Sequence, residues 1–337
     1  MAGVWITGSE LVGWLSELVG RKLGLGVTEV DLEQAIQRLD LTELWPDDLS
    51  AMYRYRSEAI EELARAALES FGDPDAGRIR RSPLVTLNLL REFPQFPEAL
   101  AVMDFVLTEI GSLADAAKPD SVIKPTSIVS RVGEQWGADG LRFAKRLLEE
   151  VNVHLYVSPW TSVARSEFEN RAALRSLFES ECLPAELGPF FDQRFIDFLH
   201  ANPDAITTVH WRQFEGLVGE WLRRAGLRVQ MGPGRNDDGI DVRAWDAAAS
   251  VDTPALLLVQ CKREKAKIGK VIVKALAADV EFEGATAGLV VTTSSWSPGA
   301  REVVASRNYP IAEANKGTVA SWLERMRTPG AGAWLAE

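Results

Sequence analysis

Hydrophobic residues recur every three or four positions along the first 205 residues, which is the spacing of helices with one buried face. The pattern predicts helices over residues 11–18, 59–71, 99–113, 141–150 and 171–178. Two of the helix starts carry a polar capping residue, Ser9 before Glu10 and Ser57 before Glu58. Residues 151–158 alternate and are rich in β-branched side chains, so a short strand in a small winged element is an alternative there. The pattern therefore predicts a mainly α-helical module over residues 1–205.

The pattern changes in the C-terminal part, where short apolar runs predict strands between helices. Helices are expected over residues 194–200, 209–225, 268–282, 298–307 and 319–326, and strands over 227–231, 239–245, 255–263, 286–293 and 309–312. The order is α-β-β-β-α-β with additions, which predicts an α/β domain with a mixed central sheet flanked by helices. We place this second domain at residues 206–337.

Composition agrees with a folded protein, since 46% of the 337 residues are hydrophobic and 25% are charged. No apolar run approaches the roughly 20 residues of a membrane helix. The first residues lack a basic segment ahead of an apolar block, so we expect no signal peptide and a cytoplasmic protein. Two cysteines, Cys182 and Cys261, and three scattered histidines argue against a disulfide framework and a zinc site.

The net charge of −11 at first argues against a nucleic-acid partner, because phosphate binding depends on Lys and Arg. The distribution of charge along the chain changes that conclusion. Residues 206–337 hold 17 Lys and Arg against 15 Asp and Glu, a balance of +2, which leaves −13 for residues 1–205. Several acidic residues of the C-terminal part, such as Asp237 and Asp238, lie near a possible cation site, and residues 262–274 are rich in lysine. The C-terminal domain is therefore compatible with DNA.

Candidate chemistry begins at the predicted strand 255–263, whose polar end holds Gln260 and Lys262 two residues apart. Side chains two apart lie on the same face of a strand. Cys261 points to the other face, where a free cysteine is commonly a small buried core residue, so we exclude it as a nucleophile. If the strand 239–245 pairs antiparallel with this one, Asp241 lies beside Gln260 and Lys262.

The preceding helix offers two carboxylates, Glu215 and Glu220. At 100° per residue, Glu215 lies at the edge of the apolar face, beside Val218 and Leu222, whereas Glu220 projects on the other flank. A carboxylate that borders the buried face can reach the end of the sheet. We therefore favour Glu215 as a site residue and expect Glu220 to be a solvated surface charge.

These four groups suit hydrolysis of a phosphodiester. A hard cation such as Mg²⁺ takes oxygen ligands, and Asp241, the amide oxygen of Gln260 and Glu215 could supply them. Lys262 could position the attacking water or neutralise charge on the transition state, and Glu215 could hold a second cation or its water. Singly, each residue type occurs at such a position without function. The predicted site rests on all four occurring in this order of elements.

Several short motifs resemble the Mrr-like restriction endonucleases of the PD-(D/E)xK superfamily. They are Phe214-Glu215, Gly239-Ile-Asp-Val242, Val259-Gln-Cys-Lys-Arg263 and Gly288-Leu-Val-Val-Thr-Thr-Ser294, within residues 206–327, about two-fifths of the chain. The resemblance implies the αβ nuclease core, Mg²⁺-dependent DNA cleavage, with Mn²⁺ as a substitute, and active-site roles for Asp241, Gln260, Lys262 and Glu215. It also implies a part in restriction or anti-phage defence.

One feature departs from that family. Its best-known members carry a basic winged-helix DNA reader before the nuclease, whereas residues 1–205 here are acidic and predicted to be helical. A regulatory, sensor or oligomerisation role is at least as reasonable for this module. Two alternatives to a freely acting DNA endonuclease therefore stay open. One is a gated nuclease effector of a larger defence assembly with a protein partner. The other is a non-cleaving nucleic-acid-binding protein, and the sequence does not distinguish DNA from RNA as substrate.

Overall fold

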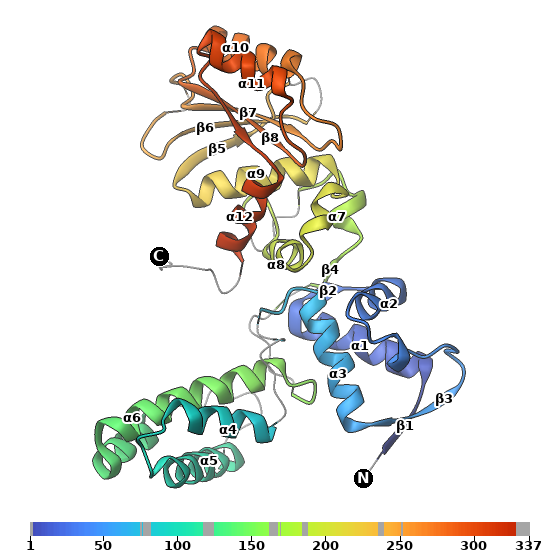
Figure 1. The fold of residues 1–337 in the computed structure, drawn as a ribbon, viewed down its shortest axis with the longest axis vertical. Helices are drawn as coiled ribbons and strands as arrows, with labels where there is room; N and C mark the ends of the chain where they lie inside the picture. Colours follow the sequence, from blue (N-terminus) through green and yellow to red (C-terminus); the bar gives the residue numbers. More distant parts are fainter. Residues whose placement is uncertain are drawn as a thin grey trace. The chain divides into compact units, whose positions relative to one another are not determined.

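A computed structural model describes residues 3–74, 76, 82–116, 125–161, 168, 170–183, 188–234, 239–250 and 252–327 (Figure 1). The chain forms two units. The first comprises Met1–Leu23, Ile36–Glu69 and Asp75–Phe168, and the second comprises Gly24–Ala35, Ser70–Pro74 and Glu169–Glu337. The second unit thus includes segments that precede residue 206 in the sequence, and the predicted boundary between residues 205 and 206 stays a prediction.

The first unit is mainly helical, as the sequence predicts. Its elements are β1 (Gly3–Thr7), α1 (Gly8–Leu23), η1 (Thr42–Leu44), β3 (Met52–Arg56), α3 (Ser57–Ser70), α4 (Ser82–Glu92), α5 (Ala99–Ala116) and α6 (Thr126–Val157), and α2 (Glu29–Arg38) is shared between the units. Helices α4, α5 and α6 enclose a core that includes Val102, Val106 and Phe143. Helix α6 is interrupted at Gly137, whose φ of 63° lies in the left-handed region.

The structure corrects one prediction for this region and adds two strands that were not predicted. Residues 151–157 continue α6, so the alternative strand in a winged element is wrong for them. Strands β1 and β3, which the sequence reasoning missed, pair antiparallel with Trp5 opposite Arg54. Each strand has only five residues and leads directly into a helix, which explains why the helical pattern dominates this part of the sequence.

The second unit begins with β2 (Leu25–Gly26), which pairs with β4 (Ala172–Ala173). Then come α7 (Ser176–Glu179), α8 (Gln193–Ala201), η3 (Pro203–Thr207) and α9 (Trp211–Arg224). The predicted helix over 171–178 is therefore mostly wrong, since a short strand and a single helical turn occupy that range. A buried ion pair, Arg194 with Asp192, anchors the start of α8, and Arg194 also donates hydrogen bonds to the carbonyls of Gly24 and Asn170.

A five-stranded mixed sheet forms the centre of this unit. Its strands are β5 (Leu227–Met231), β6 (Val242–Asp246), β7 (Leu257–Lys262), β8 (Ala287–Thr292) and β9 (Ile311–Ala314), in that spatial order. The pairs β5–β6 and β6–β7 are antiparallel, and β7–β8 and β8–β9 are parallel. The parallel pairs are joined by α10 (Lys270–Glu283) and α11 (Pro298–Arg307), and α12 (Lys316–Met326) follows β9. The predicted α/β architecture is confirmed.

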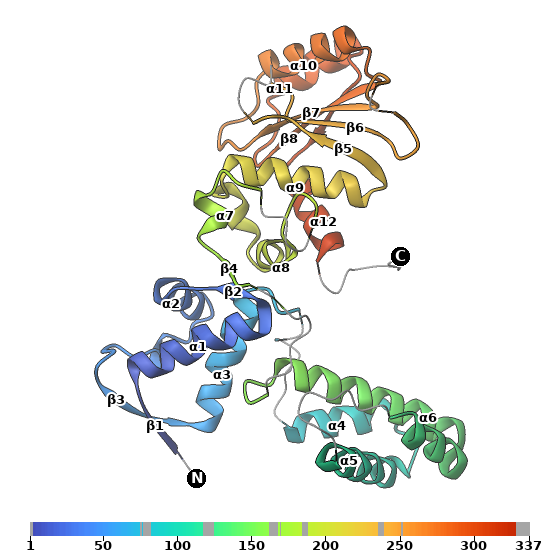
Figure 2. The same ribbon diagram turned by 180° about the vertical axis from the view of Figure 1, so that it is seen from behind.

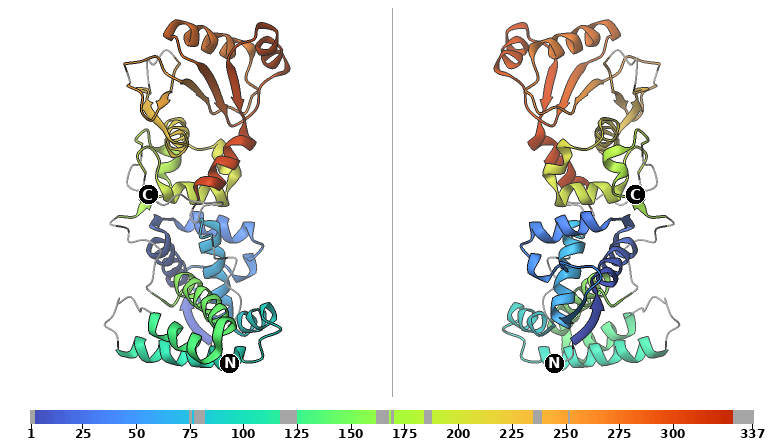
Figure 3. Two further views of the ribbon diagram at one scale, coloured as in Figure 1. Left: turned by 90° about the vertical axis from the view of Figure 1, so that its left-hand side faces the viewer. Right: turned by 90° about the vertical axis from the view of Figure 1, so that its right-hand side faces the viewer.

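Helices cover both faces of the sheet (Figures 2 and 3). On one face, Leu258 of β7 and Val290 of β8 belong to a core shared with α10 and α11. The residues that alternate with them, Val259 and Val291, are fully buried on the other face, on which α9 packs. This three-layer arrangement holds the C-terminal end of β7 beside the start of β6.

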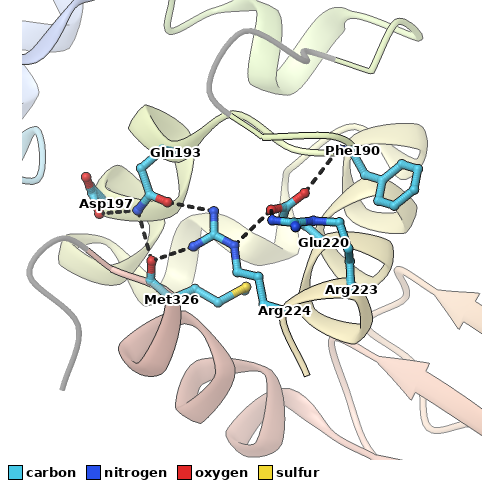
Figure 4. A network of polar contacts seen from close by, with 7 residues as sticks. All are labelled: Phe190, Gln193, Asp197, Glu220, Arg223, Arg224 and Met326. Atoms are coloured by element: carbon cyan, nitrogen blue, oxygen red, sulfur yellow. Dashed lines mark hydrogen bonds and ion pairs between the residues drawn. The ribbon is translucent and has the colours of Figure 1, made fainter. Parts of the chain in front are cut away.

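Glu220 corrects another expectation, because its side chain is fully buried rather than solvated. Its carboxylate accepts hydrogen bonds from Arg224 Nε at 2.8 Å, from Arg223 Nη2 at 3.0 Å and from the backbone N–H of Phe190 at 3.1 Å. These residues are drawn in Figure 4. Arg224 also donates to the carbonyl of Met326 in α12 and to Gln193 in α8. The network therefore ties α9 to α8 and α12. A buried charge requires such partners, and the arginines three and four residues later supply them.

Candidate active site

Asp241 lies directly before β6 and is buried where that strand meets β7. Its backbone N–H donates to the carbonyl of Val259 at 2.9 Å, and its Oδ2 accepts from the backbone N–H of Cys261 at 2.6 Å. The second bond fixes the carboxylate against the strand that carries Gln260 and Lys262. The antiparallel pairing that the sequence suggests therefore sets Asp241 against β7 at Cys261, the residue between Gln260 and Lys262.

The side chains of Gln260 and Lys262 lie on the same face of β7. The two residues pair with Val290 and Thr292 of the neighbouring parallel strand β8. Gln260 is buried, and its Oε1 accepts no hydrogen bond from the described residues. The backbone comes close to its amide at Gly239, where an added Cβ would lie 2.9 Å from Gln260 Nε2. Gly239 also has a φ of 86°, so both its conformation and this contact favour glycine.

Glu215 approaches the same place from α9 and is buried. Its Oε2 accepts a hydrogen bond from Arg212 Nη1 at 2.8 Å. Burial, followed by the charge of Asp241, raises the pKa of Glu215 from the ordinary 4.5 to about 8, although Arg212 acts in the opposite direction. Glu215 and Asp241 therefore form a pair of neighbouring carboxyl groups that resist simultaneous ionisation in the absence of a cation.

Arg212 is a site residue that the sequence reasoning missed. Besides Glu215, its guanidinium donates to the carbonyl of Gly232 at 2.9 Å, which ties the first turn of α9 to the segment after β5. The signal was present in the sequence, because Arg212 and Glu215 are three residues apart and side chains at that spacing meet on a helix. Arg212 thus fixes the direction in which the Glu215 carboxyl points.

Two further expectations from the sequence concern Cys261 and the acidic residues Asp237 and Asp238. Cys261 is half-buried rather than fully buried, and burial of its thiol, followed by the charge of Asp241, raises its pKa well above the ordinary value. A thiol held protonated is a poor nucleophile, which agrees with its exclusion. Asp237 and Asp238 lie outside the described residues.

The donor set fits a hard divalent cation. Burial, followed by the charge of nearby Asp241, raises the pKa of Glu215, and the buried amide oxygen of Gln260 on β7 accepts no hydrogen bond from the described residues. Such an arrangement is costly unless a positive charge or a donor occupies it. Within the described ranges, no three His, Cys, Asp or Glu side chains gather as a metal site. A cation here would therefore depend on the amide oxygen of Gln260 in addition to the two carboxylates.

Comparison with known proteins places the sheet domain in a family. Residues 206–323 match the Mrr_cat family model, described as restriction endonuclease. Among solved structures, the chain is similar to the MspJI restriction endonuclease in complex with a 27-mer oligonucleotide, at 17% identity and a TM-score of 0.28. That alignment covers 57% of this chain and 40% of that chain. None of the curated proteins matches this chain. Residues 206–323 therefore form an Mrr-like restriction-endonuclease domain.

Proposed function

We propose that this chain is an Mg²⁺-dependent endonuclease that hydrolyses phosphodiester bonds of DNA. The observation that carries the proposal is the position of Asp241, which is fixed by the Cys261 N–H beside the Gln260 oxygen and next to buried Glu215. The match of this domain to a restriction-endonuclease family supports DNA as the substrate. Mn²⁺ would replace Mg²⁺, because both are hard cations that take oxygen ligands.

Each residue has a separate part in the proposed reaction. Asp241, Gln260 and Glu215 would hold the cation, which when bound polarises the phosphate and makes water a better nucleophile. The ammonium group of Lys262 would neutralise negative charge that grows on the phosphate oxygens in the transition state. Arg212 would keep Glu215 pointed at Asp241, since it binds both Glu215 and the carbonyl of Gly232.

A substrate panel tests this proposal. The purified chain is incubated with supercoiled plasmid, linear duplex DNA, single-stranded DNA and RNA, each with Mg²⁺, Mn²⁺ or EDTA. We expect cleavage of DNA with either cation and none with EDTA. Cleavage that persists in EDTA would contradict the metal-dependent mechanism, and cleavage of RNA alone would contradict DNA as substrate.

We also propose a role in restriction or another defence against foreign DNA, which the family match supports. Cells that express the wild-type chain should plate phage less efficiently than cells that express Lys262→Ala at the same protein level. Equal plating on both strains, with a panel of unrelated phages, would count against this role.

A gated effector is the second candidate, and the first unit offers an observation in its favour. Trp5 and Met52 lie on one face of the β1–β3 pair and are 63% and 61% exposed. Large exposed apolar side chains of this kind often mark a protein contact. On this hypothesis the nuclease would cut only when a protein partner or modified DNA is added. Trp5→Ser should then abolish the activation without lowering any basal cleavage, and unchanged activation would exclude this face.

Among the described helices, none is long and apolar enough to span a lipid bilayer.

A further inference from the structure

Helix α10 carries apolar residues on the face that points away from the sheet. Its inner face, with Val273, Leu276 and Val280, belongs to the core of the second unit. Its outer face holds four apolar residues at spacings of four, three and four: Val271, Ala275, Ala278 and Phe282. All four are exposed, Val271 by 72% and Phe282 by 91%. Figures 1 and 3 show this helix on the outer layer of its unit.

Residues at this spacing form one continuous face of a helix. At 100° per residue, positions 271, 275, 278 and 282 fall within about 60° of one another. This outer apolar face has two large side chains at its ends and two alanines at its centre. Surface helices of a monomer normally carry polar residues at such positions. The outer apolar face of α10 therefore indicates a contact with another protein surface.

Charged residues border one edge of the outer apolar face. Lys270 and Lys274 lie on that edge in the N-terminal half of the helix, and Glu281 lies on the same edge near its C-terminal end. None of the three forms an ion pair within the described part of the chain. The edge is therefore basic at one end of the helix and acidic at the other.

We propose that α10 packs antiparallel against the α10 of a second copy of this chain, about a two-fold axis that passes between Ala275 and Ala278. In this arrangement Val271 of each copy lies opposite Phe282 of the other, and the alanines of the two copies meet at the centre. Small central residues allow two helices to approach closely, toward the lower end of the roughly 8–10 Å seen between packed helices. A two-fold interface is self-complementary in the way that this sequence pattern requires.

The charges select this orientation. The two-fold axis brings the same edge of both helices to one side of the interface. With a rise of about 1.5 Å per residue, Glu281 of one copy falls about 3 Å along the axis from both Lys270 and Lys274 of the other. A parallel pair, related by an axis along the helices, would instead set this edge of one copy against the opposite edge of the other, which carries Asp279 and Glu283. Glu281 would then face two further acidic residues, and like charges at such a distance repel. The antiparallel pair thus joins opposite charges twice.

The occupant of the outer apolar face is accordingly a second copy rather than an unrelated protein, because α10 is complementary to itself in both shape and charge. One helix on each side makes a small interface, so we expect a dissociation constant on the order of micromolar. The consequence for cleavage rests on the proposed function. Two copies supply two active sites, which is what cutting both strands of a duplex in one encounter requires.

Sedimentation of the full chain over a concentration series, without DNA or metal, tests the interface. The wild type should pass from monomer to dimer as its concentration rises. Ala278→Glu places a charge at the centre of the interface twice and should raise the dissociation constant at least about tenfold. Its matched control is Ala101→Glu on α5, another exposed helical alanine, which should leave the dissociation constant unchanged.

Charge reversal tests the orientation. Glu281→Lys should weaken the dimer by roughly fivefold, since two surface ion pairs become repulsive. The triple variant Lys270→Glu, Lys274→Glu, Glu281→Lys restores opposite charges and should return to within about twofold of wild type. A monomer at every concentration, a dimer unaffected by Ala278→Glu, or a triple variant as weak as Glu281→Lys would each overturn the proposal.

These outcomes are separate from those of the proposed function. Sedimentation requires no catalysis, so a dimer that cleaves nothing would contradict the nuclease assignment alone. A monomer that cleaves DNA with Mg²⁺ would contradict the α10 interface alone.

Discussion

Replacing Glu215 by glutamine should abolish a pH dependence of folding stability in the metal-free protein. Burial and the nearby Asp241 raise the pKa of Glu215 from 4.5 to about 8. Because the folded state holds this proton to higher pH than the unfolded state, the stabilisation is complete below pH 4.5. It is lost as the pH rises through about 8. Glutamine resembles the protonated carboxyl in shape and carries no charge to desolvate at any pH.

The expected size of the effect follows from these pKa values. From pH 6 upward the wild type should lose about 1.4 kcal/mol of unfolding free energy per pH unit through this group, and less as the pH approaches 8, where the folded carboxyl is half ionised. The loss between pH 6 and pH 8 is roughly 2.3 kcal/mol. Little further unfolding free energy should be lost above pH 9, where the carboxyl is ionised in both states. Glu215→Gln should lack this component, so the difference in unfolding free energy between the two proteins should change by roughly 2.3 kcal/mol between pH 6 and pH 8.

Urea unfolding in EDTA, followed by tryptophan fluorescence between pH 6 and pH 9, measures this difference. Glu302→Gln is the matched control, because Glu302 is an exposed carboxyl on α11. Its unfolding free energy should follow that of the wild type at every pH. If the unfolding free energy of Glu215→Gln falls with pH as steeply as that of the wild type, Glu215 titrates normally and does not share a buried site with Asp241.

Three further outcomes are expected. The affinity for Mg²⁺, measured by calorimetry, should rise by up to about tenfold per pH unit below pH 8, because Glu215 must lose its proton to bind a cation. A Mg²⁺ affinity that does not change with pH would exclude Glu215 as a ligand. Gly239→Ala should lower the cleavage rate at least about tenfold while the fold persists, because the new methyl would displace Gln260. Glu220→Ala should cost about 3 to 5 kcal/mol in urea unfolding, since Arg224 would lose its buried partner.

The sheet domain could be predicted because its strands and helices have local sequence patterns that repeat along the chain. Strand β5 falls on its predicted residues, and β7 and β8 lie within their predicted ranges, since short apolar runs bounded by turns leave few alternatives. The position of Asp241 against β7 followed from alternation along two strands and needed only that they pair antiparallel. The catalytic roles of these residues stay predictions.

The features that the sequence did not predict depend on contacts between distant segments of the chain. Glu220 was expected in solvent because it projects on the other flank of the apolar face of α9. In the structure its carboxylate is buried against the Phe190 N–H and Arg224, a contact with a distant segment that no local pattern predicts. Residues 151–157 continue α6 because the short run of β-branched residues is overridden by the long helix that contains it. For Glu220 and for residues 151–157, tertiary contacts outweigh the preference of the local sequence.

Plasmid nicking by matched site variants tests whether Asp241 and Lys262 belong to the active site. Wild type, Asp241→Ala, Lys262→Ala and the exposed control Glu302→Gln are compared at equal concentration with Mg²⁺, after each is shown to be folded. We expect cleavage by the wild type and the control, and a cleavage rate at least about a hundredfold lower for Asp241→Ala and Lys262→Ala. Nicking that survives both substitutions would place the chemistry elsewhere in the molecule and contradict the proposed site.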